Sequence, residues 1–288
     1  MGALIRVLVL LVLAAAVFGG GGYYTYLLYV KPDLELQREK DSPVPAQPAV
    51  EDPTLVEYAK CLRVEEAGDP LAARRSFEDF LENYPDSSKA EEARYRLGAI
   101  QMQLLFTPRM TPGKQVYVVK SGDVLNKVSH RLKVPVEMLM AMNAMEGSNL
   151  RVGQRLLWVP ADFSTVVDRK GGKVVVLKGG EFFAQCEIRA TRGSASLGPP
   201  KKGAPLEVKA KVVDKAAWKE GQRMGITEKG SREALHWIVL QPGGHTLYAE
   251  PGEGAEKVSR PSSGYGLDPD RVRELSALLR KNETVTIR

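Results

Sequence analysis

The feature that most constrains this chain is an uncharged stretch near its N-terminus. No Asp, Glu, Lys or Arg occurs between Arg6 and Lys31, which leaves 24 consecutive uncharged residues. A helix rises about 1.5 Å per residue, so this stretch is long enough to cross the ~30 Å hydrocarbon core of a bilayer. The positive charge of Arg6 lies on the short N-terminal side. The positive-inside rule therefore places the rest of the chain outside the cytoplasm.

Two interpretations of this segment, residues 1–30, remain open. Its first half is strongly apolar, and the three alanines at 14–16 fit the cleavage region of a signal peptide. The Tyr-rich stretch 23–30 prolongs the apolar run and favours an uncleaved membrane anchor, because Tyr side chains prefer the membrane interface. Both interpretations export the chain. Residues 31–53 follow with five prolines among polar residues, which predicts an extended linker.

The remaining composition argues against several classes of protein. The net charge is +6, but residues 51–107 carry 7 basic against 12 acidic side chains and residues 108–160 carry 8 against 3. No long Lys/Arg run or aromatic-plus-basic RNA motif occurs, so we expect no nucleic-acid partner. Two cysteines exclude a disulfide-rich scaffold and a four-cysteine zinc site. Three histidines leave little material for metal or triad chemistry, so we expect no cofactor and no metal.

Residues 54–107 predict helices. Apolar residues recur at helical spacing, Pro70 suits the first turn of a second helix, and the stretch 84–87 separates it from a third. The segment resembles a tetratricopeptide unit over little more than one 34-residue period. The matching residues are Gly68, Asp69, Ala72, Phe77, Tyr84, Pro85, Ala93 and Gly98. Two roles remain open: a surface that docks an envelope protein or a second copy, or a helical hairpin that packs on the next domain or acts as a spacer.

Residues 115–160 predict the order strand, helix, helix, strand (βααβ). A β-type run at 116–119 is followed by two amphipathic helices, and a return strand ends before Pro160. The segment resembles a LysM domain over its full length. The matches, in register, are Tyr117, Val118, Val119, Lys120, Ser121, Gly122, Asp123, Leu125, Val134, Leu139, Asn143, Leu150, Val152, Gly153, Gln154, Leu156 and Pro160.

The LysM resemblance implies binding to glycan that contains N-acetylglucosamine, which outside a bacterial membrane means peptidoglycan. In this family the glycan lies between the loop after the first strand and the loop before the second. Those loops supply the candidate glycan-binding residues Gly122, Asp123, Val124, Leu125, Asn149, Leu150, Arg151 and Val152. Val124 departs from the hydroxyl residue that is commonest there, which removes one hydrogen bond. Asp123 also fits a turn or cap residue.

Residues 162–288 predict a mainly β domain. Strand patterns occur at 165–168, 174–177, 182–190, 206–213, 237–240 and 284–287. One helix fits 270–280, with Asp268 as N-cap and Pro269 at its first position. This order resembles the L,D-transpeptidase catalytic domain. The landmarks are Val167-Asp168 with the hairpin after it, the stretch 198–206 in place of a Thr-Pro-Thr-Gly segment, Lys211–Val213 with Trp218, and the stretch 260–264 before the nucleophile.

The chain departs from that family at the nucleophile. The family has Ser-His-Gly-Cys, with Arg two residues after the Cys. Read in register, the Cys position is Tyr265, the His position is Ser263 and the Arg position is Leu267. Transpeptidation requires a thiolate that attacks an acyl carbonyl. A phenol, with a pKa near ~10, is a poor substitute at neutral pH.

A cysteine and two serines in the domain are the other candidate nucleophiles. Cys186 lies inside a predicted strand, far from the motif in sequence. A serine nucleophile at Ser262 or Ser263 needs a base, for which only His245 is available nearby. We therefore assign no catalytic residue and expect a domain that keeps the fold and binds stem peptide or acts as a scaffold.

Together these segments predict a multidomain α+β protein. It has an N-terminal transmembrane helix, a helical hairpin, the βααβ LysM module and a mainly β L,D-transpeptidase-like domain. The leading hypothesis is a membrane-anchored protein of the cell envelope, with its body in the periplasm or outside the membrane and with peptidoglycan glycan strands as its partner. The alternatives are a divergent L,D-transpeptidase or carboxypeptidase, and an envelope scaffold that acts through residues 54–107.

Overall fold

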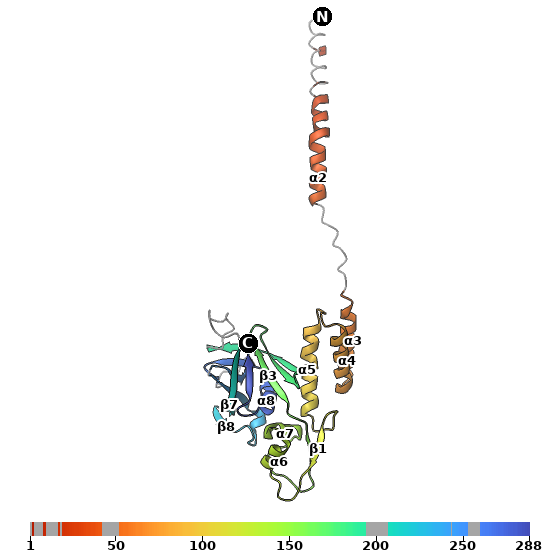
Figure 1. Cartoon of the computed structure of the whole chain (residues 1–288). Helices are drawn as coiled ribbons and strands as arrows, with labels where there is room; N and C mark the ends of the chain where they lie inside the picture. Colours follow the sequence, from red (N-terminus) through yellow and green to blue (C-terminus); the bar gives the residue numbers. More distant parts are fainter. Residues whose placement is uncertain are drawn as a thin grey trace. The chain divides into compact units, whose positions relative to one another are not determined.

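The computed structural model describes residues 2, 8–9, 17, 19–41, 52–193, 207–242, 244–252 and 260–288. The chain divides into two compact units, Met1–Asp52 and Pro53–Arg288. The described part of the first unit is mainly helical, and the second unit contains helices and sheets (Figure 1). The mixed α+β architecture that the sequence predicts is therefore confirmed.

The N-terminal unit is helical from residue 19 to residue 41. Its π-helical stretch η1 (Tyr26–Val30) leads into α2 (Lys31–Asp41). Apolar side chains of this segment, such as those of Tyr24 and Tyr29, are exposed. Within the described residues, no helix combines the length and the apolar character that crossing a membrane requires. Much of the expected span, including residues 10–16, lies outside the described residues.

The extended linker expected over residues 31–53 is wrong for its first part, because α2 occupies Lys31–Asp41. Only Pro32 falls inside this helix. The π-helical stretch η1 directly precedes it, and the Lys31 N–H donates to the Tyr26 carbonyl. That change of hydrogen-bond register accommodates a residue that has no N–H to donate. After Pro32 come strong helix formers such as Leu, Glu, Gln, Arg and Lys. Residues 42–51, with the next three prolines, lie outside the described residues.

Three helices open the second unit: α3 (Thr54–Glu66), α4 (Pro70–Asn83) and α5 (Ala90–Phe106). Asp69 caps α4, since its side chain accepts hydrogen bonds from the N–H groups of Leu71 and Ala72, and Pro70 occupies the first turn. The three helices share a core that includes Tyr58, Phe77, Phe80 and Leu97. Figure 1 shows α3 and α4 side by side, with α5 facing the sheet.

Helix α5 packs directly on strand β5 (Glu181–Glu187) of the C-terminal sheet. Gly98 permits this close approach, because a Cβ at this position would lie 2.8 Å from the Ala184 Cα. Glu91 accepts a hydrogen bond from Gln185 Nε2 at 3.0 Å and forms an ion pair with Lys173. The helical segment therefore packs on the next domain, which is one of the two roles that the sequence left open.

The strand–helix–helix–strand module has the predicted order. It consists of β1 (Gln115–Val118), α6 (Leu125–Leu132), α7 (Val136–Met142) and β2 (Arg155–Trp158), with β1 and β2 antiparallel. Asn143 joins α7 to β2, because its side chain donates to the Leu139 and Leu157 carbonyls and accepts from the Leu157 N–H. These bonds fix the second helix on the two-stranded sheet.

Within the described residues, the C-terminal sheet has ten strands. Those that the sequence predicted are β3 (Phe163–Asp168), β4 (Lys173–Lys178), β5, β7 (Val208–Lys219), β9 (Leu235–Gln241) and β12 (Thr284–Ile287). The others are β6 (Ala190–Arg192), β8 (Gln222–Met224), β10 (Thr246–Ala249) and β11 (Gly264–Leu267). The order is β5-β4-β3-β12-β7-β9-β10-β11-β6, with β8 paired to β7. The pairs β3–β12 and β10–β11 are parallel.

Helix α8 (Pro269–Leu278) covers β9 and β10. Asp268 is its N-cap, since the side chain accepts a hydrogen bond from the Asp270 N–H, and Pro269 lies in the first turn. Val272, Leu275 and Leu278 point into a large core that the helix shares with the sheet. The helix, its cap and its buried face therefore follow the prediction.

The βααβ module shares that large core. Met138 and Met142 of α7 are fully buried among residues of the sheet and of α8. Lys215 of β7 forms an ion pair with Glu137 of α7 at 3.0 Å and donates to the carbonyls of Ser276 and Leu279 at the end of α8. The module and the C-terminal sheet are therefore joined by buried contacts, and the methionines fill the core as the sequence indicates.

Candidate functional site

The two loops predicted to bind glycan meet at one open cavity of about 400 Å³. Its lining includes Asp123, Val124, Leu125, Asn149 and Leu150. The structure therefore brings together residues from both loops. Gly122, Arg151 and Val152 are not part of the lining, and Asn126 and Ser148 are lining residues that the sequence analysis missed. We call this cavity the loop groove.

Gly122 shapes the first loop. Its φ of +80° is a conformation that favours glycine, and the Asp123 N–H donates to the Lys120 carbonyl across this turn at 3.1 Å. Gly153 has the same role in the second loop, with φ +85° and an N–H that donates to the Val119 carbonyl. Both glycines set the path of the backbone, and Asp123, which follows Gly122, lines the groove.

Asp123 is held by its own module. Its Oδ2 accepts hydrogen bonds from the Tyr117 hydroxyl at 2.6 Å and the Lys120 N–H at 2.9 Å, and Arg131 pairs with Oδ1 at 3.3 Å. The Tyr117 hydrogen bond, followed by that of the Lys120 backbone, lowers the pKa of the Asp123 carboxyl. This carboxylate therefore positions the loop, which agrees with the turn role that the sequence allowed.

The start of α6 presents backbone donors to the groove. Val124 is the N-cap residue, with extended φ and ψ and no side-chain cap hydrogen bond, as its departure from a hydroxyl residue predicts. The first bond of this helix runs from the Val128 N–H to the Val124 carbonyl. The N–H groups of Leu125, Asn126 and Lys127 precede that bond and have no helical acceptor. Asn126 is exposed and lines the groove, so its N–H can donate to the carbonyl oxygen of an acetamido group.

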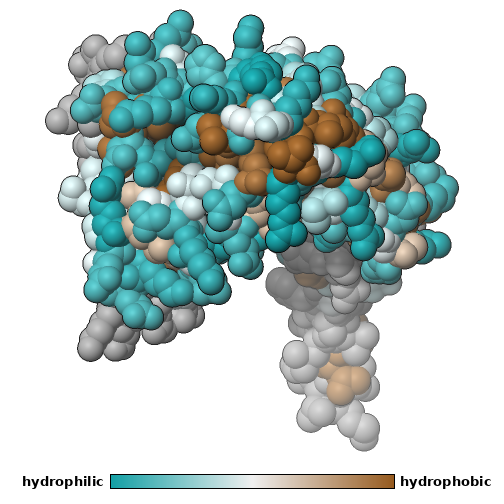
Figure 2. All heavy atoms as spheres, turned by 90° about the horizontal axis from the view of Figure 1, so that it is seen from below, coloured by the Kyte–Doolittle hydropathy of each residue, from teal (hydrophilic) through white to brown (hydrophobic). Residues whose placement is uncertain are grey.

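Leu125 contributes little to the surface of the groove. The residue is 2% exposed and its side chain lies in the core of the module, so the side chain cannot contact a ligand in the groove. The apolar contact comes from Val124, which is 52% exposed, while Leu150 packs partly against the module core. Val152 is exposed beside the groove. Figure 2 shows hydrophobic surface gathered on the face seen from below, where Figure 1 places the module.

Tyr265, at the position of the expected nucleophile, is completely buried in β11. Its hydroxyl is 3.1 Å from His245 Nδ1, and the two rings are stacked at 6.0 Å. Burial raises the pKa of Tyr265 and lowers the pKa of His245, so both groups are neutral at neutral pH. The phenol and the imidazole therefore form a packed pair, with the Tyr265 side chain buried.

The glycines on either side of Tyr265 allow β11 to approach its neighbours closely. Gly264 has φ +151°, and a Cβ there would lie 2.1 Å from the Thr246 carbonyl oxygen. A Cβ on Gly266 would lie 2.9 Å from the Tyr248 hydroxyl. Strand β11 is therefore packed closely against β10, which pairs Leu247 with Tyr265.

The alternative nucleophiles are also constrained. The Ser263 hydroxyl donates to the carbonyls of Gly244 at 2.8 Å and Arg192 at 3.1 Å. Cys186 is buried in β5, and burial raises the pKa of its thiol to about 12. A thiol with that pKa has almost no thiolate at neutral pH. The segment expected at 198–206 lies outside the described residues. Among the described residues, no group of three His, Cys, Asp or Glu side chains is placed to hold a metal ion.

Residues 117–159 match the LysM domain family. The structure is similar to an L,D-transpeptidase (Yku) from Stackebrandtia nassauensis, with 16% identity, 44% of this chain and 55% of that chain covered, and a TM-score of 0.30. It is also similar to an L,D-transpeptidase from Mycobacterium smegmatis, with 14% identity, 48% and 64% covered, and a TM-score of 0.28. The chain thus spans between half and two thirds of these two proteins. No curated protein matches the chain. The prediction of a LysM domain is confirmed.

Proposed function

We propose that this protein binds the glycan strands of peptidoglycan through the loop groove of its LysM module. The observation that carries the proposal is the convergence of the two loops on one cavity within residues that match the LysM family. The groove combines N–H groups that have no helical acceptor with the exposed face of Val124. Donors of this kind suit the acetamido carbonyl, and the valine suits the apolar face of a sugar ring.

The direct test is retention of the purified full chain on isolated peptidoglycan sacculi. Val124→Lys places a long charged side chain in the groove, and we expect it to abolish retention. The fold tolerates this change because Val124 is half exposed. Val118→Lys is the matched control, since Val118 is 49% exposed on β1 and is not part of the groove lining. Loss of retention in both variants, or no retention of the unmodified chain, would refute the proposal.

The proposal includes a location in the cell envelope with the folded body outside the cytoplasm. It is supported by the uncharged stretch 7–30 and by the position of Arg6 before it. We propose that this stretch anchors the protein in the inner membrane. Fractionation of cells that produce the full chain tests the anchor: the protein should stay with membranes after a high-salt wash. Release of a shortened chain into the soluble fraction would show that the segment is cleaved.

We further propose that the C-terminal domain does not catalyse transpeptidation. The support is the buried, neutral pair of Tyr265 and His245 and the high pKa of the Cys186 thiol. Incubation of the full chain with purified peptidoglycan fragments should leave their masses unchanged. A cross-linked or trimmed product would instead identify a divergent L,D-transpeptidase or carboxypeptidase.

A second candidate function concerns a protein partner of the helices α3–α5. Leu55, Val56 and Tyr95 are large apolar side chains that this segment exposes. Aromatic side chains such as that of Tyr95 are enriched in protein interfaces. Replacing Val56 by Lys should then abolish co-purification of an envelope protein and leave retention on sacculi intact. Equal loss of both would contradict a separate role for this segment.

A further inference from the structure

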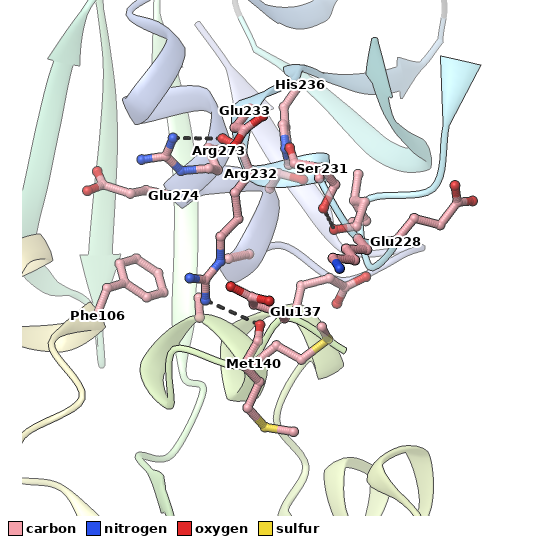
Figure 3. Close-up of a pocket in the computed structure, with 18 of the residues that line it drawn as sticks. Phe106, Glu137, Met140, Glu228, Ser231, Arg232, Glu233, His236, Arg273 and Glu274 are labelled. Carbon is pink, nitrogen blue, oxygen red and sulfur yellow. Dashed lines mark hydrogen bonds between the residues drawn. The ribbon is translucent and has the colours of Figure 1, made fainter. Parts of the chain in front are cut away.

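A cavity that the glycan proposal does not use lies between the LysM module and the C-terminal domain. Its volume is about 690 Å³. One wall comes from α7 and the loop after it, and the other comes from the 3-10 helix η3 (Ser231–Glu233) and α8 (Figure 3). We call this cavity the intermodule cleft.

Hydrogen bonds connect and support the walls of the intermodule cleft. Arg232 reaches across it and donates to the Met145 carbonyl at 3.3 Å (Figure 3). Two hydrogen bonds of Ser231 stabilise the wall at η3. Its carbonyl oxygen lies 2.8 Å from His236 Nε2, and its hydroxyl donates to the Ile226 carbonyl. A preformed cavity binds a ligand without the cost of ordering its own side chains.

The lining of the cleft combines apolar side chains with charged side chains of both signs. Phe106, Met140 and Ile226 contribute apolar surface. Among the described residues, neither Lys229 nor Arg232 forms an ion pair, although both line the cleft and are exposed. Of the acidic lining residues, Glu137, Glu233 and Glu274 are paired with Lys215, Lys219 and Arg271. Glu146 and Glu228 form no ion pair in the described part of the chain.

This pattern suits a short zwitterionic peptide. Lys229 and the remaining donors of Arg232 can bind carboxylates, Glu146 and Glu228 can bind an amine, and the apolar lining residues can contact the carbon chain. A purely anionic ligand would meet Glu146 and Glu228, and a purely apolar one would leave four charges facing it. The volume lies within the range of about 300–1,000 Å³ that small ligands occupy.

The cleft and the loop groove are neighbours. Glu146 lines the intermodule cleft and Ser148 lines the loop groove, and one residue separates them in the same loop. Two residues of extended chain span at most about 7 Å. A ligand that lies in the groove can therefore reach into the cleft with a branch that is only a few residues long.

We propose that the intermodule cleft binds the short peptide that branches from a peptidoglycan glycan strand while the strand itself lies in the loop groove. This inference rests on the proposed glycan binding and names the second part of the same ligand. The glycan and the peptide are covalently joined, so each holds the other at a high effective concentration near its own site. Two weak contacts then give one useful affinity.

The test compares matched ligands by calorimetry on the full chain. Muramidase fragments that retain their peptides are one probe, and the same fragments after an amidase has removed the peptides are the other. We expect the peptide-bearing fragments to bind on the order of tenfold more tightly. Lys229→Glu should remove this advantage and leave the affinity for bare glycan unchanged. Lys170→Glu, in the exposed turn between β3 and β4, is the charge-matched control.

Three results would overturn the inference. Equal affinity for both fragments in the unmodified chain shows that the peptide is not bound. An advantage that persists in the Lys229→Glu variant places the peptide elsewhere. Failure of both fragments to bind refutes the glycan proposal itself, and the inference with it. Loss of the advantage in Lys229→Glu alone supports the peptide site.

Discussion

The uncapped start of α6 gives a quantitative prediction. Val124 already has the extended backbone of an N-cap residue and lacks only a side-chain acceptor. In Val124→Thr the hydroxyl accepts a hydrogen bond from an N–H of the first turn, which is worth about 1 kcal/mol relative to alanine. The lost methyl group offsets little of this, because a fully buried methylene is worth about 0.8 kcal/mol and the Val124 side chain is half exposed. The net gain over the unmodified chain is therefore roughly 0.5 kcal/mol.

Thermal unfolding of the full chain measures this effect, with Val124→Ala as the control. For a unit of this size, about 1 kcal/mol corresponds to a shift of roughly 2–4 °C. We expect Val124→Thr to melt above the unmodified chain and Val124→Ala below it. Urea unfolding should show the same order in midpoint with an unchanged slope. If Val124→Thr melts together with Val124→Ala, the first turn of α6 gains nothing from a cap, and the N–H groups assigned to the loop groove are already satisfied.

Three further predictions concern the body of the protein. Gly98→Ala should destabilise it by about 1–3 kcal/mol in urea unfolding, although alanine favours a helix, because the new Cβ would meet the Ala184 backbone; a gain in stability would refute the close contact. Burial lowers the pKa of Lys114 to about 8. The unfolded chain therefore binds this proton more tightly than the folded chain does. The free energy of unfolding of the unmodified chain, measured relative to that of Lys114→Met, should be greatest above pH ~10.5 and should fall as the pH decreases to about 8. Cys61 and Cys186 are buried, and a disulfide reagent at pH 8 should label neither thiol until denaturant is added; rapid labelling of the native chain would contradict the burial.

Sequence patterns over a few neighbouring residues predicted the helices and strands whose ends depend on those residues alone. Asp268 and Pro269 mark the start of α8, and the alternating apolar residues of β3 and β4 mark a hairpin. The βααβ order follows from turn residues and helical spacing within about 45 residues. The prediction of an extended linker over residues 31–53 is wrong at α2, because the backbone hydrogen-bond register changes around Pro32. The number of prolines in the sequence does not reveal that change.

Other features depend on pairings between distant residues. Strands β10 and β11 have four residues each, and β11 alternates glycine with Tyr265 and Leu267, so neither strand shows an apolar run long enough to predict. Their parallel pairing brings His245 near Tyr265 from 20 residues away. At the loop groove, the sequence located both loops. It could not show that the Leu125 side chain turns into the core.

The packing of α7 on the C-terminal sheet limits how this LysM module can be exchanged between proteins. A module that is connected only by linkers can be moved between proteins by recombination without loss of stability. Here excision of residues 115–160 would uncover the pocket that holds Met138 and Met142, and it would leave the buried ammonium of Lys215 without Glu137. A transplanted module would have to supply two apolar side chains and one carboxylate on the same helical face. The recombining unit of this protein is therefore the module together with its sheet.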